Sequence, residues 1–349
     1  MSLVLIGGTI GLGNDNNTDI LIQVKNLKKC FKLAGRRLLH AVDDVSFDVE
    51  RGKTLGLVGE SGCGKSTVGN VIMGLLSPTG GQVIMEGMSV FEATGSQKNE
   101  LKRKMQIIFQ DPYSSLNPRK TVRSILSEGY LVQKIASGKE LEQTLHKLCD
   151  TVGIAHELLD YYPHELDGGM RQVVGIARAL SLNPSFVVCD EPVSSLDVSV
   201  QAQIINLLMD LQKEFNLTYL FISHDLSVVR HISDRIAVMY LGQIVEIADT
   251  DRIFHDCTHP YTIALLSAVP RVNASRKVER ILLKGDVPSP VDPQPGCRFA
   301  KRCWMAQDNC HTQDPPMVEI AEGHSSRCHY TDISREKAKT AEKMMISDY

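Results

Sequence analysis

The sequence has no long apolar run and no excess of charge of either sign. Its longest apolar runs fall well short of the about 18 residues that cross a bilayer, which excludes an integral membrane protein but not one that docks on a membrane. Lys and Arg number 38 and Asp and Glu 41, giving a net charge of -3. This near-balance argues against a protein that works by coating nucleic acid. No segment recurs at a fixed period.

The N-terminus lacks a basic lead, and the cysteines lack a paired pattern. Residues Ser2–Gly13 are mildly apolar but interrupted by glycines. This predicts a flexible tail over residues 1–19 rather than an export signal. The nine cysteines are odd in number, and single ones stand inside apolar strands. This usage is typical of a reduced cytosolic protein rather than of a disulfide scaffold.

The sequence does contain enough apolar residues for a packed core. Its 349 residues suggest two domains, or one with appendages. Hydrophobic residues make up 43% and charged residues 23%, which excludes wholesale disorder. Apolar runs predict strands at Ile20–Val24, Ala41–Val49, Thr54–Val58, Met105–Phe109, Phe186–Cys189 and Tyr219–Ile222. Helical patterns run from Ser66 to near Pro78, over about 111–183, and between the last two strands. The alternation predicts an α/β fold with a mainly parallel sheet covered on both faces.

The composition changes after about Ile253. Prolines crowd the region as far as Pro316, and the last four cysteines lie inside it. We expect a Cys- and Pro-rich C-terminal appendage there, followed by a charged tail over residues 334–349.

A phosphate-binding motif decides the class of the protein. Residues Gly59–Thr67 match G-x-x-x-x-G-K-[ST], with an apolar strand before and an amphipathic helix after. The glycines let the backbone N–H groups converge on phosphate oxygens, and the helix N-terminus adds partial positive charge. Lys65 would reach the β- and γ-phosphates, and the Ser66 hydroxyl would bind Mg²⁺.

Three further strands end in polar residues that suit hydrolysis. The strand Phe186–Cys189 leads into Asp190, which would hold the metal, and Glu191, which would orient or deprotonate the attacking water. The strand Tyr219–Ile222 leads to His224, which would contact the γ-phosphate and the water, and Gln110 follows Phe109 and would sense metal or water. Parallel strands bring their carboxyl ends to one edge of the sheet, so these residues are expected to meet there.

With these residues the chain resembles the ATP-binding subunits of ABC transporters, and more narrowly those of the oligopeptide/dipeptide importers. The resemblance covers about residues 20–330. It rests on Gly59–Thr67 (Walker A), Gln110 (Q-loop), Asp190 and Glu191 (Walker B and catalytic glutamate), and His224 (switch histidine). It also rests on the signature region Leu166–Gln172, with Asp167, Gly168, Gly169 and Met170, and on the D-loop Ser194–Asp197, with Ser195, Leu196 and Asp197.

The resemblance implies a P-loop NTPase fold. Residues 20–255 would form the ATPase domain, with a RecA-like core, an ABC β-subdomain and an inserted helical subdomain over about 111–183. Residues 256–333 would form an oligopeptide-transporter-type C-terminal domain. Phe31 stands where the family stacks an aromatic ring on adenine. The expected nucleotide-binding residues are Phe31, Gly59, Glu60, Ser61, Gly62, Cys63, Gly64, Lys65, Ser66, Thr67, Gln110 and Asp190, with Ser66, Gln110 and Asp190 at Mg²⁺.

Two segments carry the likeness to peptide importers. One is Asp111–Arg119, and the other is His259–Thr262 followed by the Pro- and Cys-rich stretch. The residues Cys189–Val193 and Leu282–Pro290 are closer to the subunit usually named with the letter F than to its D partner.

The resemblance also implies a mechanism and partners. Two ATPase subunits, here this chain and a D-type paralogue, would face each other head to tail. Each ATP would lie between one subunit's P-loop and the other's signature helix, whose dipole and N–H groups stabilise the γ-phosphate. Two transmembrane permease subunits, served by an extracytoplasmic substrate-binding protein, would receive the motion through the helical subdomain. The chain would then be peripheral, on the cytoplasmic face of the inner membrane, and a single chain would hydrolyse ATP slowly.

Two residues depart from the family pattern, and one of them is Val173, where an arginine is common in this helix. The family has Ser before the two signature glycines, where this chain has Asp167. An ionised aspartate would repel the γ-phosphate held on the partner's P-loop, which predicts an asymmetric heterodimer with one impaired site. The alternatives are that Asp167 is protonated, or that it caps the helix and points away from the nucleotide.

Four late cysteines suggest a metal centre. Cys297, Cys303, Cys310 and Cys328 follow a C-x5-C-x6-C-x17-C spacing, without the close pairs that zinc sites favour. Similar peptide-importer subunits include members with a [4Fe–4S] cluster, and the resemblance implies one here. Zinc, and free or disulfide-linked thiols, are the alternatives.

Three other functions remain open at this stage. Related ATPases import nickel or other small solutes. A soluble ABC-type ATPase acting on nucleic acid would need a basic face or a coiled-coil insertion, and neither is present. A cluster-bearing regulatory subunit that binds ATP without turnover is opposed by Glu191 and His224.

Overall fold

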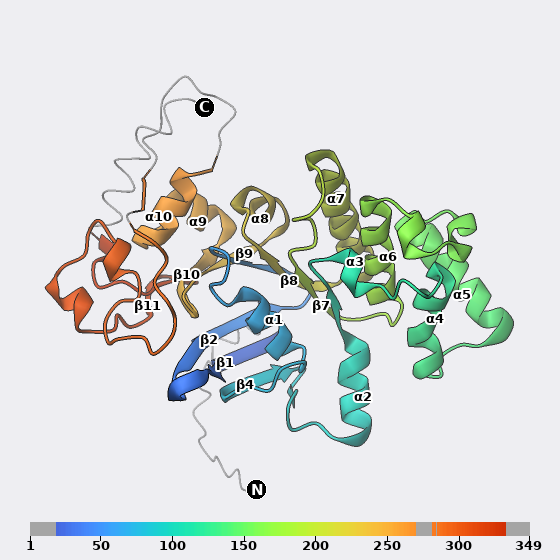
Figure 1. Cartoon of the computed structure of the whole chain (residues 1–349), viewed down its shortest axis with the longest axis horizontal. Helices are drawn as coiled ribbons and strands as arrows, with labels where there is room; N and C mark the ends of the chain where they lie inside the picture. The colour runs from blue at the N-terminus through green and yellow to red at the C-terminus, as the bar shows by residue number, and fades with distance from the viewer. Residues whose placement is uncertain (1–18, 270–280, 284, 333–349) are drawn as a thin grey trace, which may run out of the picture.

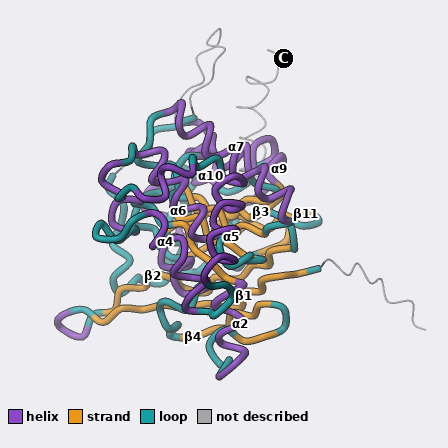
Figure 2. The backbone as a smooth tube through the Cα atoms, turned by 90° about the vertical axis from the view of Figure 1, so that its right-hand side faces the viewer, coloured by secondary structure: helices purple, strands orange, loops and turns teal. Residues whose placement is uncertain are grey.

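The computed structural model describes residues 19–269, 281–283 and 285–332, which form two β-sheets with helices around them (Figure 1). The larger sheet has the strand order β11-β12-β10-β9-β3-β8-β7-β6, and the smaller has the order β2-β1-β4-β5. Turned by 90°, the molecule has β1 and β4 at the bottom, β3 in the middle, and α7 and α9 towards the top (Figure 2). The predicted tails fall outside the described residues, apart from Asp19.

The centre of the larger sheet is parallel, as the alternation of strands and helices predicted. Its parallel strands are β6 (Met105–Ile108), β7 (Phe186–Asp190), β8 (Thr218–Ser223), β3 (Thr54–Val58) and β9 (Arg235–Tyr240). All residues of β3, β7 and β8 are buried. Continuous burial of this kind requires cover on both faces, which explains why these strands read as unbroken apolar runs.

The smaller sheet is antiparallel. It consists of β1 (Ile20–Lys32), β2 (Leu38–Glu50), β4 (Gly80–Met85) and β5 (Met88–Ser89), with a short 3-10 turn, Ala34–Arg36, between the first two. Helix α1 (Lys65–Ile72) shares one hydrophobic core with this sheet. A Cβ atom on Gly69 would lie 3.0 Å from side-chain carbons of both Ile222 and Val188, so α1 packs closely on the larger sheet as well.

Helices occupy most of the segment predicted to be helical. They are α3 (Pro112–Ser115), α4 (Val122–Val132), α5 (Gly138–Val152) and α6 (Gly168–Leu180), with 3-10 turns at His156–Asp160 and Pro163–Glu165. They lie on the right of Figure 1. Helix α2 (Gly95–Lys104) precedes β6, and α7 (Val198–Phe215) and α8 (Leu226–Ile232) flank β8.

The C-terminal region adds two strands to the edge of the larger sheet. This region begins after β10 (Gln243–Asp249). It contains α9 (Thr250–Asp256), α10 (Pro260–Ser267), the 3-10 turns Ala300–Arg302 and Asp308–His311, β11 (Val318–Ala321) and β12 (His324–Ser326). Strand β12 pairs with β10 in antiparallel register. A bridge from Val291 to Leu39 and a bond from the His40 N–H to the Pro290 carbonyl join the region to β2 as well.

One element is shorter than its pattern predicted. The helix after the P-loop was expected to run to near Pro78, but α1 ends at Ile72. Gly74 has φ +69°, and its N–H bonds to the Val71 carbonyl. Such a left-handed residue closes a helix, and glycine adopts it without steric cost.

Candidate nucleotide-binding site

The loop Gly59–Gly64 connects the carboxyl end of β3 to the start of α1. Gly64 has φ +109°, and a Cβ atom there would approach the Ala41 carbonyl oxygen to 2.1 Å. Both facts require glycine, because other residues rarely adopt this conformation and none would fit. The glycine of the motif therefore lets the loop turn tightly against β2 before α1 begins.

A cleft of about 260 Å³ opens over this loop. Its lining is Phe31, Leu39, His40, Ala41, the residues from Ser61 to Thr67, Gln110, Glu191, Gly242 and Pro290. The cleft thus brings Phe31, the P-loop, the Q-loop glutamine and the proposed catalytic glutamate together. Of the expected nucleotide-binding residues, Gly59, Glu60 and Asp190 do not line it.

Lys65 is buried inside the loop, with 4% of its surface exposed. Its Nζ donates to the carbonyl oxygens of Gly59, at 2.9 Å, and Glu60, at 3.1 Å. Within the described ranges no carboxylate lies at ion-pair distance from Lys65. A buried cation held only by neutral carbonyls favours an anionic ligand.

Ser66 and Asp190 meet where α1 begins and β7 ends. The Ser66 hydroxyl donates to Asp190 Oδ1 at 2.8 Å. Burial raises the pKa of Asp190, and the hydrogen bond from Ser66 partly offsets this. A hydroxyl beside a buried carboxylate, next to a phosphate-binding loop, matches the oxygen ligands that Mg²⁺ prefers when substrate phosphates complete its shell. These residues therefore fit the metal that the motif implies.

Glu191 connects three strand ends. Its Oε2 accepts a hydrogen bond from Gln110 Nε2, after β6, at 2.9 Å, and lies 3.3 Å from His224 Nδ1, after β8. Its backbone has φ +46°, and its N–H donates to the Ile222 carbonyl of β8 at 3.0 Å. The structure therefore brings these side chains together at one edge of the sheet, where the sequence predicted them. A carboxylate held by two neighbours beside a phosphate cleft has the placement of a general base for water.

The signature region and the D-loop lie against each other. Asp167 Oδ1 accepts from the Met170 N–H at 2.7 Å and caps α6. A Cβ atom on Gly168 would lie 3.5 Å from Leu196 Cδ2, and one on Gly169 would lie 2.8 Å from Val200 Cγ1. Gly168, Ser195 and Asp197 are exposed, and none of them lines the P-loop cleft. The Asp167 carboxylate therefore caps α6.

The four late cysteines converge on one small cavity. Cys297, Cys303, Cys310 and Cys328 all line it, together with His259, Phe299 and Tyr330 among others. The Met305 N–H donates to Cys303 Sγ and the Tyr330 N–H to Cys328 Sγ, each at 3.4 Å. Burial raises the pKa of Cys297 and of Cys328 to about 11. No group of three or more His, Cys, Asp or Glu side chains in the described part of the chain is placed to hold a metal ion.

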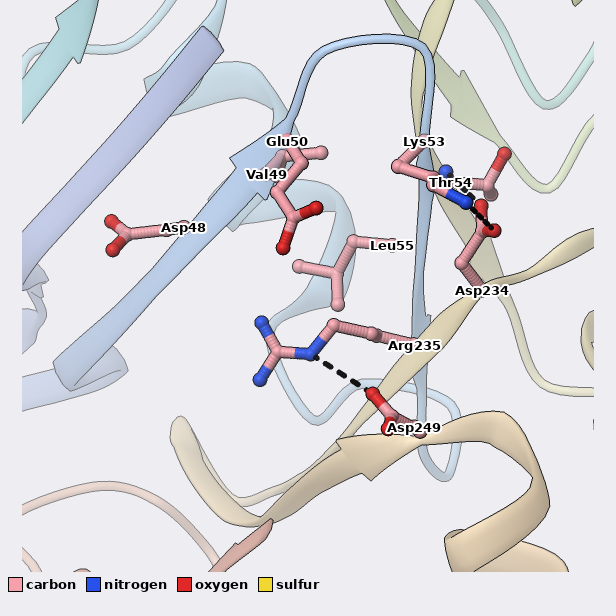
Figure 3. A pocket seen from close by; sticks show the side chains of 9 residues that line it. All are labelled: Asp48, Val49, Glu50, Lys53, Thr54, Leu55, Asp234, Arg235 and Asp249. Atoms are coloured by element: carbon pink, nitrogen blue, oxygen red, sulfur yellow. Dashed lines mark hydrogen bonds and ion pairs between the residues drawn. The ribbon is translucent and has the colours of Figure 1, made fainter. Parts of the chain in front are cut away.

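A second open cavity, of about 280 Å³, lies at the opposite edge of the sheet, where β3 and β9 begin (Figure 3). Four of its six charged side chains pair with one another. Lys53 Nζ bonds Asp234 at 2.9 Å, and Arg235 Nε lies 3.7 Å from Asp249. Parallel sheets bind their ligands at the carboxyl ends of the strands, and this cavity is at the amino ends. It is therefore not the candidate site.

Sequence reasoning missed several residues of the P-loop cleft and its support. Gly242, in the turn between β9 and β10, lines the cleft without belonging to any motif noted in the sequence. Pro290 ends the segment Leu282–Pro290, which was noted for its likeness to peptide importers and not as part of the cleft. Tyr261 and Arg302, from the C-terminal region, bond to Glu60 of the P-loop. In the sequence, Tyr261 lies within His259–Thr262 and Arg302 lies beside Cys303. Neither position indicates a contact with the P-loop.

The comparisons with known proteins agree with this geometry. A family profile described as "ABC transporter" matches residues 42–194, and one described as "Oligopeptide/dipeptide transporter, C-terminal region" matches residues 245–310. The chain is 47% identical to the oligopeptide transport ATP-binding protein AppF of Bacillus subtilis over 322 residues, covering 90% of this chain and 98% of AppF. It is 46% identical over 321 residues to the dipeptide transport ATP-binding protein DppF of Haemophilus influenzae, covering 90% and 98%.

Solved structures give the same result. The cbiO1 protein of Clostridium perfringens, part of the ABC transporter complex cbiONQ, superimposes with a TM-score of 0.60 at 26% identity, covering 68% of this chain and 91% of that one. The ADP- and Pi-bound dimer of the ATP-binding cassette MJ0796 also gives a TM-score of 0.60 at 26% identity, covering 66% and 99%. The chain therefore belongs to the ABC transporter family, among the ATP-binding subunits of oligopeptide and dipeptide transporters.

Proposed function

We propose that this chain binds ATP and hydrolyses it to ADP and phosphate, and that the reaction powers an importer of dipeptides or oligopeptides. The observation that carries the proposal is the meeting of Gln110, Glu191 and His224 beside the cleft that holds the P-loop. The class of solute is supported by two relatives, AppF, an oligopeptide transport ATP-binding protein, and DppF, a dipeptide transport ATP-binding protein.

In this mechanism each part of the cleft has one task. Phe31 stacks on the adenine ring, the N–H groups from Ser61 to Thr67 receive the phosphates, and Lys65 exchanges its loop carbonyls for phosphate oxygens. Ser66, Asp190 and Gln110 would hold Mg²⁺, which neutralises charge on the phosphates when bound. Glu191 orients the attacking water and takes up its proton, while Gln110 and His224 hold the carboxylate in place.

The complete machine has further subunits. The exposed Gly168 and the D-loop would face the P-loop of a D-type ATPase paralogue, so that each nucleotide lies between two chains. Two permease subunits would receive the motion through α3–α6, and an extracytoplasmic binding protein would deliver the solute. No helix in the described ranges has the length and apolarity needed to cross a membrane. The chain would act as a peripheral protein on the cytoplasmic face of the inner membrane.

Asp167 would make the two composite sites unequal. Its carboxylate caps α6 by accepting from the Met170 N–H, at the helix end that would face the partner's γ-phosphate. A negative charge at that end opposes the phosphate, even when it is satisfied by the cap. Asp167→Ser keeps a capping oxygen and removes the charge, so turnover of the assembled transporter should rise. An unchanged rate would show that the cap does not impair the partner's site.

The cysteine cavity would hold a [4Fe–4S] cluster. The support is the convergence of four thiols and two N–H···S bonds on one enclosed cavity. A single zinc ion is less well matched, because the C-x5-C-x6-C-x17-C spacing lacks the close cysteine pairs that zinc sites favour. Anaerobically purified protein should absorb near 400 nm, and a colourless protein with zinc in stoichiometric amount would contradict the cluster.

Substitution of Lys65 tests the main proposal. Lys65→Ala should weaken ATP binding by at least about tenfold and abolish peptide uptake in cells that carry it as the sole copy, because the buried cation is lost. Lys98→Ala, at an exposed lysine of α2, is the matched control and should change neither. If Lys65→Ala left both ATP affinity and uptake intact, the proposed function would be wrong.

A further inference from the structure

The C-terminal region contacts the P-loop at Glu60. Arg302 Nη1 donates to Glu60 Oε2 at 2.7 Å, and Arg302 Nη2 donates to Glu60 Oε1 at 3.2 Å. This is a two-pronged pairing of guanidinium and carboxylate, which is stronger and more directional than a single contact. The Arg302 side chain is 8% exposed and that of Glu60 is 27% exposed, so water screens the pair only in part.

The backbone of Glu60 is held from the same region. Its N–H donates to the hydroxyl oxygen of Tyr261, on α10, at 2.9 Å. Its carbonyl oxygen accepts from Lys65 Nζ at 3.1 Å and from the Cys63 N–H at 3.3 Å. Glu60 therefore joins the C-terminal region to the lysine and to the middle of the P-loop.

The two anchoring residues are themselves fixed by packing. The rings of Tyr240 and Tyr261 have centroids 4.7 Å apart, and Phe299 lies 5.3 Å from the first and 5.4 Å from the second. All three are at most 1% exposed. The Arg302 guanidinium lies 6.0 Å from the centre of the Tyr240 ring. A buried aromatic cluster therefore sets where Arg302 and the Tyr261 hydroxyl stand.

We propose that Arg302 and Tyr261 are positioning residues for nucleotide binding, because they hold the first turn of the P-loop in place through Glu60. The proposal rests on the ATP-binding function given above. A loop already held in its binding shape loses less conformational entropy when the phosphates arrive, so the anchors increase affinity. Among the described residues, neither Arg302 nor Tyr261 bonds to Glu191, the proposed general base. The chemical step should therefore depend on them little.

The test compares variants of the anchor with a matched arginine. Arg302→Gln and Glu60→Gln should each weaken ATP binding by about tenfold and raise KM, with kcat within about twofold. Arg302→Lys, which keeps the charge and loses the fork, should lie between Gln and the natural residue. The double variant should be no weaker than the worse single one, because both remove the same contact. Tyr261→Phe should weaken binding about threefold, from the loss of one hydrogen bond.

The control is Arg252→Gln. Arg252, on α9, also holds the C-terminal region together, because its Nη1 donates to the Glu322 carbonyl at 2.6 Å. No hydrogen bond or ion pair among the described residues joins Arg252 to the P-loop. This control should leave ATP affinity unchanged. General loosening of the C-terminal region would instead lower affinity in Arg252→Gln as much as in Arg302→Gln, and that result would overturn the proposal.

The sole tryptophan gives a readout besides activity. Trp304 lies two residues from Arg302 and is 39% exposed. Nucleotide binding at the P-loop should change Trp304 fluorescence in the natural chain and in Arg252→Gln, but not in Arg302→Gln. A response that survives Arg302→Gln undiminished would show that this contact does not connect the two regions.

The remaining outcomes also decide the matter. If Arg302→Gln does not fold, Arg302→Lys and Glu60→Gln carry the test, and natural ATP affinity in both would overturn the proposal. If Lys65→Ala abolishes ATP binding while Arg302→Gln and Glu60→Gln bind normally, only the positioning role fails. If Lys65→Ala also binds normally, the proposed function fails.

Discussion

At the residue scale, the candidate site depends on side-chain contacts that join different elements of the fold. Glu191 Oε2 faces both Gln110 and His224, and Asp190 Oδ1 accepts from the Ser66 hydroxyl. Each pair joins different strand ends or a strand to α1. A small displacement of one strand end therefore changes the surroundings of the proposed catalytic carboxylate and of the proposed metal ligands together.

Glu191→Gln separates binding from hydrolysis. The amide keeps the size of the side chain and still offers an oxygen to Gln110, but it removes the charge that takes up a proton. We expect ATP affinity within about twofold of the natural chain and hydrolysis slower by about a hundredfold or more. Phosphate release and equilibrium ATP binding measure the two effects. Glu157→Gln, at an exposed glutamate, is the control. A parallel loss of affinity and rate in Glu191→Gln would contradict the role as base.

The Cys63 thiol should react slowly with alkylating agents, and its reaction should need a higher pH than that of an exposed thiol. It is 4% exposed, and burial raises its pKa above the usual 9.0. A raised pKa keeps the thiol protonated to higher pH, so less of the reactive thiolate is present at a given pH. Alkylation followed by peptide mass spectrometry should show slow labelling at pH 8, faster labelling as pH rises above 9, and protection by ATP. Half-buried Cys30, outside the lining of the cleft, serves as the comparison. Equal labelling of Cys63 with and without ATP would contradict its place in the cleft.

At the element scale, the sequence predicted strand positions better than strand order and ends. Buried parallel strands such as β7 and β8 read as unbroken apolar runs, so they and the polar residues after them could be located. The C-terminal strands could not be located in this way, because β11 and β12 are short. They join the sheet through the pairing of β12 with β10, and a long proline-rich stretch separates these two strands in the sequence. The end of α1 at Ile72 depends on the left-handed turn at Gly74, while apolar residues continue beyond it.

Glu246 ties the elements of the C-terminal region together. It lies on β10, is fully buried, and accepts from the Thr258 N–H at 2.6 Å, the His259 N–H at 3.1 Å and His324 Nε2 at 2.9 Å. Burial alone would raise the pKa of Glu246, but the hydrogen bonds from His324 and its other neighbours outweigh burial and lower it. The carboxylate is therefore charged, and it joins β10 to α10 and β12.

Glu246→Ala should destabilise the C-terminal region more than the substitution of an exposed residue does. It leaves two backbone N–H groups and His324 buried without an acceptor, which should cost about 3–5 kcal/mol. Hydrogen exchange of the backbone amides in α10 and β12 should speed up, while those of β7 and β8 should change little. Glu92→Ala, at an exposed glutamate, should change neither set. Unchanged protection of β12 in Glu246→Ala would show that other contacts hold the region.

At the scale of the whole molecule, the proposed head-to-tail dimer would give this chain half of each of two composite sites. The P-loop cleft is lined by Gln110 and Glu191 but by none of the signature or D-loop residues of the same chain. Those residues include the exposed Gly168, Ser195 and Asp197. The contact between Arg302 and Glu60 shows what sequence reasoning cannot find at this scale, since 242 positions separate the two residues.

Hydrolysis should therefore depend on the concentration of the chain. If α6 of a second copy or of the paralogue must complete the cleft, the rate per chain should rise with protein concentration when ATP is saturating, and dilute protein should hydrolyse slowly. The missing N–H groups and helix end would stabilise the γ-phosphate in the transition state, and loss of such donors slows a reaction by about a hundredfold or more. Glu191→Gln should accumulate as an ATP-bound dimer, visible by light scattering, because it binds but does not turn over. A rate per chain that stays constant from nanomolar to micromolar protein would mean that the chain completes its own site, and the head-to-tail dimer would have to be abandoned.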